Sequence, residues 1–308
     1  PSRSRERIGN ALARLASEGE NFLLLEKAVR SENTVASCVL HHPHWILLSS
    51  TVDVSGLIKG HVYGKRDGIV YTSATLRHRN RFDEFCRIVG IETGEGEAGI
   101  PPGGLNGRTL DFALEEREFR FAAIPSPFSR DALEVVLPDC TENGGFENKK
   151  RWLKTVGDQL PELIRRNRGR TLVLFASYRD LEAVASQVGE EIIADGFPLL
   201  IQQAGHPTGN LIDEFRLIKE SVLFGVDTFW YGVDFQGDTL TQVIITRVPF
   251  PYPFDPLQIA RKRMLPPREF WNRYYYEATI KLKQGIGRLI RSETDRGRVV
   301  FLDSRCRQ

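Results

Sequence analysis

The hydrophobic and polar positions along this chain change period at several points, and each period predicts a type of element. In residues 5–29 apolar side chains recur three or four positions apart between charged ones, which predicts an amphipathic helix. Short, largely apolar runs predict buried strands, at residues 45–50, 68–72, 119–123, 132–137, 171–175, 199–202, 221–226, 241–246 and 298–302. Helical periodicity returns at residues 81–89, 149–166, 178–188, 211–219 and 269–283.

Strands that alternate with helices in this way predict an α/β fold. Apolar runs without polar alternation are typical of parallel strands buried on both sides, so we expect a parallel sheet with helices on both faces. Ligands of such sheets bind at the carboxyl ends of the strands. Functional residues are therefore expected directly after strands.

A shift in composition predicts a boundary within the chain. Residues 92–109 are rich in glycine, glutamate and proline and include the run Pro101-Pro102-Gly103-Gly104. Such a segment has little to bury and is typical of a loop or linker. The sequence therefore predicts three parts, at residues 1–91, a linker at 92–118, and a main domain at 119–308.

Composition limits the classes of function. Hydrophobic residues make up 41% of the 308 residues, which is enough for a substantial core, and the net charge of +2 restricts any nucleic-acid contact to a local patch. The four cysteines are far apart without a C-x-x-C pair, and the histidines at positions 41, 42 and 44 suit a surface turn, so no metal site is expected. No apolar run is long enough to cross a membrane, and no signal peptide is present, so a cytoplasmic protein without a membrane partner is predicted.

The most specific pattern lies at residues 284–291, which read Q-G-I-G-R-L-I-R. Arg288 and Arg291 are three positions apart, which predicts that they share one face of a helical turn. Guanidinium groups bind phosphate oxygens in a planar, bidentate way, and an arginine at a transferring phosphate stabilises the transition state. The alternative is an amphipathic helix whose two arginines are solvated, and the short pattern G-x-G-R taken alone would favour that alternative. Gln284 and the full spacing favour the phosphate contact.

A second pattern, F-W-Y-G-V-D-F at residues 229–235, directly follows a predicted strand. Gly232 suits a tight turn, and Asp234 can accept hydrogen bonds from the backbone or from the arginines; a simple capping turn is the alternative. The segment R-V-P-F-P-Y-P at residues 247–253 comes next. Its rings, Phe250 and Tyr252, are able to stack on bases. For Phe250 a core or domain-interface position is slightly favoured, and for Tyr252 both positions stay open.

Two weaker patterns place hydroxyl groups after strands. Residues 72–76 read T-S-A-T-L, and the small hydroxyls of Ser73 and Thr75 suit an interface that exchanges hydrogen bonds. Residues 174–178 read L-F-A-S-Y, where Ser177 is expected to cap the next helix and, with Tyr178, to face a phosphate at the helix N-terminus.

Taken in order, these four patterns resemble motifs III, IV, V and VI of the DinG/XPD-type superfamily 2 DNA helicases. The resemblance implies a RecA-like second motor domain, preceded by a short helical remnant of the arch and the last strands of the first motor domain. It also implies ATP hydrolysis with Mg²⁺ and 5′-to-3′ movement on single-stranded DNA, with the first motor domain as a partner. The family's iron–sulfur cluster would lie in that absent half.

The resemblance assigns roles to individual residues. The catalytic network comprises Gln284, Asp234, Arg288 and Arg291. The ATP-binding set comprises Gly232, Gly287, Arg288 and Arg291. Coupling of hydrolysis to movement is assigned to Ser73 and Thr75. Contacts with nucleic acid are assigned to Ser177, Tyr178, Phe250 and Tyr252.

The chain departs from the family pattern in two ways. Tyr231 stands where the family usually has glutamate, so the ATPase is either weakened or tolerant of the change. No G-x-x-x-x-G-K-[ST] phosphate-binding loop occurs anywhere, and the nearest segment, residues 104–109, lacks the lysine. The chain also starts at Pro1 rather than methionine, which suggests a fragment or a processed chain. We therefore expect a motor half that is inactive as an ATPase alone. The alternative is a non-enzymatic nucleic-acid or partner-binding module with a degenerate helicase fold.

Overall fold

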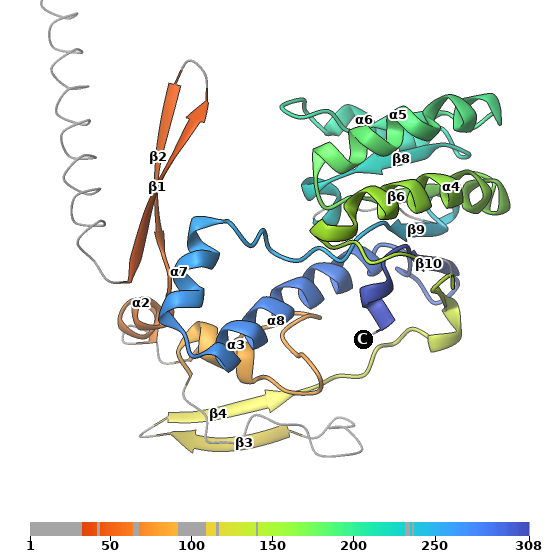
Figure 1. The fold of residues 1–308 in the computed structure, drawn as a ribbon. Coiled ribbons are helices and arrows are strands. Elements are labelled where there is room, and N and C mark those ends of the chain that lie inside the picture. Colours follow the sequence, from red (N-terminus) through yellow and green to blue (C-terminus); the bar gives the residue numbers. More distant parts are fainter. Residues whose placement is uncertain are drawn as a thin grey trace, which may run out of the picture. The chain divides into compact units, whose positions relative to one another are not determined.

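The computed structural model describes residues 33–41, 44–63, 68–91, 109–114, 117–139, 141–231, 235 and 237–307 (Figure 1). The helix predicted at residues 5–29 lies outside this part of the chain, as do Gly232 and Asp234. The chain divides into two compact units. The first comprises Pro1–Ile100, Phe112–Phe119 and Pro251–Arg273, and the second comprises Pro101–Asp111, Arg120–Phe250 and Tyr274–Gln308.

The second unit is built on a six-stranded parallel sheet in the order β5-β10-β9-β6-β8-β7. Its strands are β5 (Leu133–Val136), β6 (Thr171–Leu174), β7 (Leu199–Ile201), β8 (Val222–Gly225), β9 (Gln242–Ile245) and β10 (Gly297–Phe301). Its helices are α4 (Lys149–Asn167), α5 (Tyr178–Ala194), α6 (Gly209–Leu217) and the C-terminal part of α8 (Pro267–Ile286). In register, Leu172 of the central strand pairs with Leu223 on one side and Val243 on the other.

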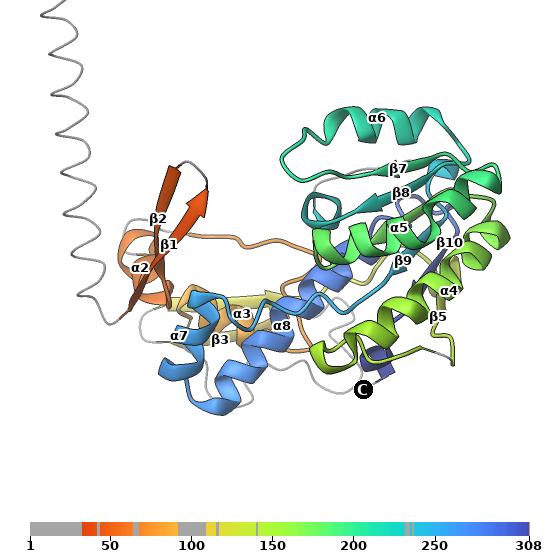
Figure 2. The ribbon, with the colours of Figure 1, turned by 45° about the horizontal axis from the view of Figure 1, so that its top comes forward.

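Both faces of this sheet are covered, as the sequence predicts. On one face α4 and α5 lie side by side (Figure 2) and bury residues such as Trp152 and Leu181 against Val173 and Phe224. On the other face Phe215 of α6 and the end of α8 pack with Trp230 against the alternate residues of the same strands. Because successive side chains of a strand point to opposite faces, one continuous apolar run supplies both layers of the core. The predicted α/β fold with a RecA-like parallel sheet is thus confirmed.

The first unit contains a hairpin and short helices. Strand β1 (Thr34–His41) pairs antiparallel with β2 (His44–Thr51). Its helices are α2 (Ser55–His61), α3 (Asp83–Val89), α7 (Pro256–Met264) and the start of α8. Helix α3 ends at Gly90, whose φ of 77° is the left-handed conformation expected of a glycine that closes a helix. Its buried residues include Cys86 and Val89.

Three details differ from the sequence-based expectations. Residues 68–72 form no strand, and Val70 is 89% exposed, because no neighbouring strand among the described residues pairs with this apolar run. Strand β3 (Thr109–Leu114) lies within the predicted linker and forms a separate two-stranded sheet with β4 (Arg117–Ala122), so the predicted strand at 119–123 is not part of the main sheet. Residues 251–273 cluster with the first unit rather than with the domain predicted at 119–308.

Candidate functional site

The carboxyl edge of the parallel sheet carries Ser177, one of the predicted site residues, together with residues that follow three other strands. Ser177 follows β6, Trp230 follows β8, Arg247 follows β9, and Asp303 follows β10. Parallel strands present their carboxyl ends at one edge, so loops far apart in sequence meet there.

Ser177 caps helix α5 as predicted. Its backbone is extended, and its hydroxyl accepts a hydrogen bond from the amide of Asp180 at 3.2 Å. The Tyr178 hydroxyl accepts a hydrogen bond from Nε2 of Gln202 at 3.0 Å. Gln202 is buried, and its Oε1 accepts a hydrogen bond from the amide of Val226 at 2.6 Å. The N-terminus of α5 is therefore tied to the ends of the neighbouring strands.

The two arginines of the 284–291 pattern lie beyond the end of α8. The helix ends at Ile286, and Arg288 and Arg291 belong to the turns that follow, so the expectation that they share a helical face is wrong. Gly287, directly after the last helical residue, favours this end, since glycine is a poor helix former. Leu289, between the arginines, is only 3% exposed and anchors the turn in the core.

The side chain of Arg288 is held by a hydrogen bond to the backbone of Trp230. Its Nη2 donates a hydrogen bond to the carbonyl oxygen of Trp230 at 3.2 Å. Arg291 is exposed, and its backbone amide donates to Oδ2 of Asp295 at 2.8 Å. Hydrogen bonds from Ser292 and from that amide hold the pKa of Asp295 below its ordinary value. Gln284 is half-buried, and its buried Oε1 has no hydrogen-bond partner among the described residues.

Trp230 is fully buried at the centre of this region. Its indole Nε1 donates to the carbonyl oxygen of Phe175 at 3.0 Å. A Cβ atom placed on Gly285 would lie 3.0 Å from the indole ring, so α8 approaches Trp230 closely only because residue 285 has no side chain. Tyr231, next to it, is 47% exposed.

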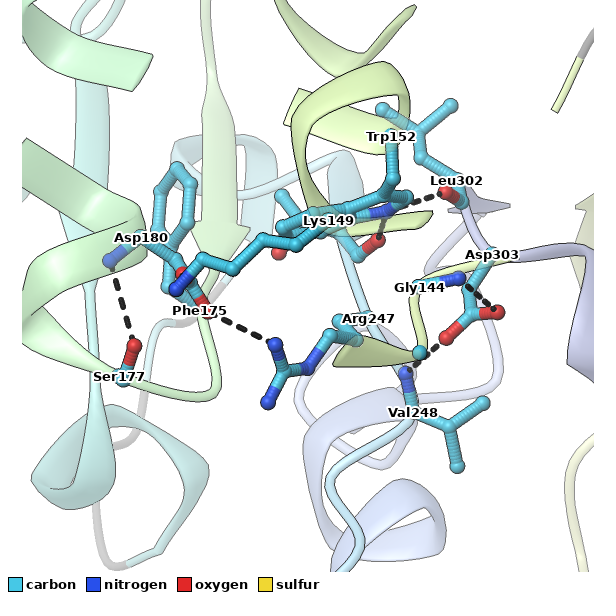
Figure 3. A network of polar contacts seen from close by, with 12 residues as sticks. Gly144, Lys149, Trp152, Phe175, Ser177, Asp180, Arg247, Val248, Leu302 and Asp303 are labelled. Atoms are coloured by element: carbon cyan, nitrogen blue, oxygen red, sulfur yellow. Dashed lines mark hydrogen bonds and ion pairs between the residues drawn. The ribbon is translucent and has the colours of Figure 1, made fainter. Parts of the chain in front are cut away.

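A buried ion network adjoins Ser177 and was not found from the sequence (Figure 3). Asp180 is fully buried, with Nζ of Lys149 at 2.7 Å and Nη1 of Arg247 at 3.2 Å from its carboxylate oxygens. The Arg247 guanidinium also lies 5.7 Å from the ring centroids of both Phe146 and Trp152. The usable signal in the sequence was the place of Arg247, directly after a strand in a sheet whose ligands bind at strand ends.

Asp303 follows β10, and its side chain contacts the loops that contain Gly144 and Val248. Its carboxylate accepts hydrogen bonds from the amides of Gly144 at 3.1 Å and Val248 at 2.9 Å, and it pairs with Arg305 at 2.6 Å. Burial raises the pKa of this carboxyl, but the hydrogen bonds from Arg305 and the two amides outweigh burial, so its pKa lies below the ordinary value. Asp303 is therefore a carboxylate that holds two loops at the edge of the sheet.

The predicted aromatic residues have two different environments. Phe250 stacks parallel on Tyr274, with ring centroids 5.4 Å apart, and the Arg305 guanidinium lies 5.1 Å from its centroid. These contacts place Phe250 in a packed cluster. Tyr252 belongs to the first unit, is 59% exposed, and meets Phe254 edge to face.

Ser73 and Thr75 also belong to the first unit. The Ser73 hydroxyl accepts a hydrogen bond from the Thr75 amide at 3.1 Å, and the two hydroxyl oxygens are 3.0 Å apart. Helix α7 carries a basic run at residues 261–263, of which Arg261 is only 9% exposed. In the part of the chain that the structure describes, no three histidine, cysteine or acidic side chains gather as metal ligands would. None of its helices has the length and apolar character needed to span a bilayer.

Comparison with known proteins gives consistent matches. Residues 160–308 match the family described as the helicase C-terminal domain. The 3′-5′ exonuclease DinG of Bacillus subtilis is 30% identical over 256 residues, which are 81% of this chain and 25% of that protein. The ATP-dependent helicase DinG of Mycobacterium tuberculosis (H37Ra) is 40% identical over 264 residues, which are 84% of this chain and 35% of that protein. A solved structure named XPD helicase matches with a TM-score of 0.46 and 23% identity, over 57% of this chain and 32% of that one.

These matches cover most of this chain but only part of each relative. The chain covers 25% of the first relative's length and 35% of the second's. The matched family is described as the helicase C-terminal domain, and strands β6 to β10, which lie within residues 160–308, all belong to the parallel sheet. Residues 160–308 therefore belong to the helicase C-terminal domain family, in a chain that is similar over most of its length to DinG helicases.

Proposed function

We propose that this chain is the second motor half of an ATP-dependent DNA helicase that moves along single-stranded DNA. The observation that carries the proposal is the contact of Arg288 with the segment that follows β8, where the Trp230 carbonyl oxygen accepts a hydrogen bond from its guanidinium. Ligands of parallel sheets bind at the carboxyl ends of the strands, and an arginine positioned in advance stabilises charge on a transferring phosphate without reorganisation.

In this proposal the two arginines act on the γ-phosphate of ATP. A guanidinium carries five N–H donors, so Arg288 can donate to a carbonyl oxygen and bind phosphate oxygens at the same time. Arg291 follows on an exposed turn whose backbone is held by Asp295. Gln284 supplies a buried amide oxygen in the preceding turn of α8. Asp234 and the glycines Gly232 and Gly287 would complete the network.

The N-terminus of α5 is the proposed contact with the nucleic-acid backbone. Ser177 lies at this N-terminus, whose partial positive charge attracts phosphate, and Lys149 and Arg247 lie nearby. With two cations beside one buried carboxylate, Asp180, the cluster keeps a net positive charge. Such a local patch is consistent with the low net charge of the chain.

The remaining parts of the proposal depend on the complete protein. The first motor domain would supply the phosphate-binding loop that the 308 residues lack, and Mg²⁺ would accompany the nucleotide. Ser73 and Thr75 would transmit hydrolysis to movement, and Tyr252 would stack on a base. The 5′-to-3′ direction is proposed on the family's behaviour alone.

DNA-stimulated ATP hydrolysis by the full-length protein tests this proposal. Arg288→Ala and Arg291→Ala are expected to lower kcat by roughly a thousandfold or more, as the loss of a phosphate-stabilising arginine does. Arg296→Ala is the matched control, because Arg296 is an exposed arginine of the following loop whose guanidinium donates to local backbone carbonyls. Its turnover should equal that of the wild type. If the wild type is inactive, or if Arg288→Ala and Arg291→Ala turn over normally, the chain is a binding module with an inherited fold.

A further inference from the structure

Lys281 of α8 contacts Trp230 and Tyr231, and the carbonyl oxygen of Trp230 is the hydrogen-bond acceptor of Arg288. The Nζ atom of Lys281 lies 5.5 Å from the ring centroid of Trp230 and 5.7 Å from that of Tyr231. An ammonium group within about 6 Å of an aromatic ring is attracted by the negative face of the ring. One cation therefore contacts two consecutive aromatic residues, the last residue of the η4 turn (Asp227–Trp230) and the residue that follows it.

The backbone of Trp230 is the other end of this connection. Its indole is fixed from two sides, by the hydrogen bond to the Phe175 carbonyl oxygen and by the close approach of Gly285. Its own carbonyl oxygen accepts the hydrogen bond from Arg288. Lys281 and Gly285 are four positions apart, so they lie on the same side of α8, and both meet Trp230. Any shift of this residue moves the acceptor that places the arginine.

We propose that Lys281 and Tyr231 are positioning residues for Arg288, with the ammonium of Lys281 holding the Trp230-Tyr231 segment by cation–π attraction. This inference rests on the proposed role of Arg288 in ATP hydrolysis. It changes the reading of Tyr231 as a departure from the family's glutamate. A carboxylate at position 231 would attract Lys281 as an ion pair, and the tyrosine ring attracts the same ammonium through its face. Tyr231 thus maintains the connection to α8, and it does not weaken ATP turnover.

Steady-state ATP hydrolysis by the full-length protein on single-stranded DNA separates the cation–π contact from simple packing. Lys281→Met keeps the length of the side chain and removes its charge, and Tyr231→Ala removes the ring. Each is expected to lower kcat about tenfold with little change in the KM for ATP, since the loss falls on the arginine that acts in the transition state. Lys281→Arg and Tyr231→Phe should stay within about threefold of the wild type, because each variant still has both a cation and an aromatic ring at this contact.

Two further variants sharpen the test. Tyr231→Glu is expected to keep turnover near the wild-type value with Lys281 present and to lose it in combination with Lys281→Met. The double variant of Lys281→Met and Tyr231→Ala should be no slower than Lys281→Met alone, because Lys281→Met already removes the cation–π contact with Tyr231. Lys283→Met is the control for loss of an exposed lysine from α8, and it should leave kcat unchanged.

The outcomes distinguish this inference from the proposed function. If Arg288→Ala abolishes turnover while Lys281→Met and Tyr231→Ala turn over like the wild type, only the positioning inference is overturned. The same holds if Lys281→Arg is as slow as Lys281→Met, since charge is then irrelevant. If Arg288→Ala itself is fully active, both proposals fail. Thermal unfolding of each variant identifies any that lose activity by misfolding, and the comparison of Lys281→Arg with Lys281→Met remains decisive.

Discussion

The side chain of Trp152 forms hydrogen bonds with the segments that follow two neighbouring strands of the sheet. Its ring is fully buried, and its Nε1 donates to the carbonyl oxygens of Thr246 at 2.9 Å and Leu302 at 3.0 Å, just beyond the ends of β9 and β10 (Figure 3). A bifurcated hydrogen bond of this kind satisfies two carbonyl groups where the ladder ends. Trp152 therefore connects α4 to two loops of the candidate site.

Trp152→Phe tests that connection. The change keeps an aromatic ring but removes the donor, so two buried carbonyl groups lose their partner, and some volume is lost. We expect the free energy of unfolding to fall by about 3 kcal/mol. Denaturant titration followed by circular dichroism measures the change. Trp271→Phe, at a 44% exposed tryptophan, is the control and should cost about 1 kcal/mol or less. Equal losses in the two variants would contradict the role given to Nε1.

Asp303 gives a prediction about pH. Its pKa in the folded chain lies below the ordinary value, so the unfolded chain binds the proton more tightly. The stabilisation is complete above the unfolded pKa of about 3.9, and it is lost as the pH falls through the lower folded value. We expect Asp303→Asn to lower the free energy of unfolding by about 3 kcal/mol at pH 7, with the difference from the wild type shrinking below pH ~4.

Unfolding titrations from pH 7 down to the acid limit of stability measure this dependence. Asp139→Asn serves as the control, because the Asp139 side chain is fully exposed and only pairs with Arg307 at the surface. Its effect should be within about 0.5 kcal/mol at every pH. A constant difference between Asp303→Asn and the wild type across the range would show that the ionised carboxylate is not the stabilising species.

The residues that sequence reasoning found and missed differ in a physical way. The cap at Ser177 was predictable because a cap depends on local sequence alone. The ion pairs of Asp180 were not, because Lys149 and Arg247 come from segments far away in the chain and meet only through the order of the strands. The environment of Phe250 depends on Tyr274 in the same way. Contacts between residues close in sequence can be predicted from the sequence alone. Contacts between residues that are distant in sequence can be identified only once the fold is known.

At the scale of elements, the approach of α8 to the sheet depends on one glycine. A Cβ at position 285 would lie 3.0 Å from Trp230 and 3.1 Å from Leu174, tighter than ordinary contact. Alanine favours a helix over glycine by about 1 kcal/mol, but overpacking costs about 1–3 kcal/mol. We expect Gly285→Ala to destabilise the chain by about 1 kcal/mol. Gly189→Ala in α5 meets only an ordinary 3.4 Å contact with Leu199 and should be neutral or stabilising. Thermal unfolding compares them, and equal behaviour would refute the close approach.

The N-terminus of α5 allows its structural and binding roles to be separated. Ser177→Ala removes the cap and should cost about 1 kcal/mol of stability, whereas asparagine and aspartate both cap well. Ser177→Asp adds a negative charge where a phosphate is proposed to bind, and Ser177→Asn does not. We therefore expect fluorescence anisotropy with a labelled oligonucleotide to show severalfold weaker binding for Ser177→Asp than for Ser177→Asn in the full-length protein. Equal affinities would remove Ser177 from the nucleic-acid contact.

The elements themselves were predictable where periodicity was long or the strand was central. Helix α4 and strand β6 begin at the residues where their patterns begin, because a fully buried strand and a strongly amphipathic helix leave a clear hydrophobic signal. The apolar run at residues 68–72 shows the limit, since a strand exists only with a partner. Helix α7 was missed because its nine residues carry three consecutive basic ones, although Arg261 is buried among them.

At the scale of the whole molecule, the distribution of the motifs is uneven. Ser73 and Thr75 belong to one compact unit, while the arginines, Gln284 and the N-terminus of α5 belong to the other. The second unit carries the groups proposed to act on the γ-phosphate and on the nucleic-acid backbone. Neither unit carries the sequence of a phosphate-binding loop. An arginine stabilises the transition state only of a nucleotide that other groups hold in place.

We therefore expect the 308-residue chain by itself to show no DNA-stimulated ATP hydrolysis. The assay is phosphate release at saturating ATP and Mg²⁺ with and without single-stranded DNA, with the full-length protein as the positive control. Without a loop that binds the β- and γ-phosphates, Arg288 has no oriented substrate, and its contribution of roughly a thousandfold or more has nothing to act on. Turnover by the isolated chain that Arg288→Ala abolishes would contradict this expectation, because the chain would then contain a nucleotide-binding site of its own. Turnover that survives Arg288→Ala would instead identify a contaminating ATPase, since it would not depend on the proposed arginine.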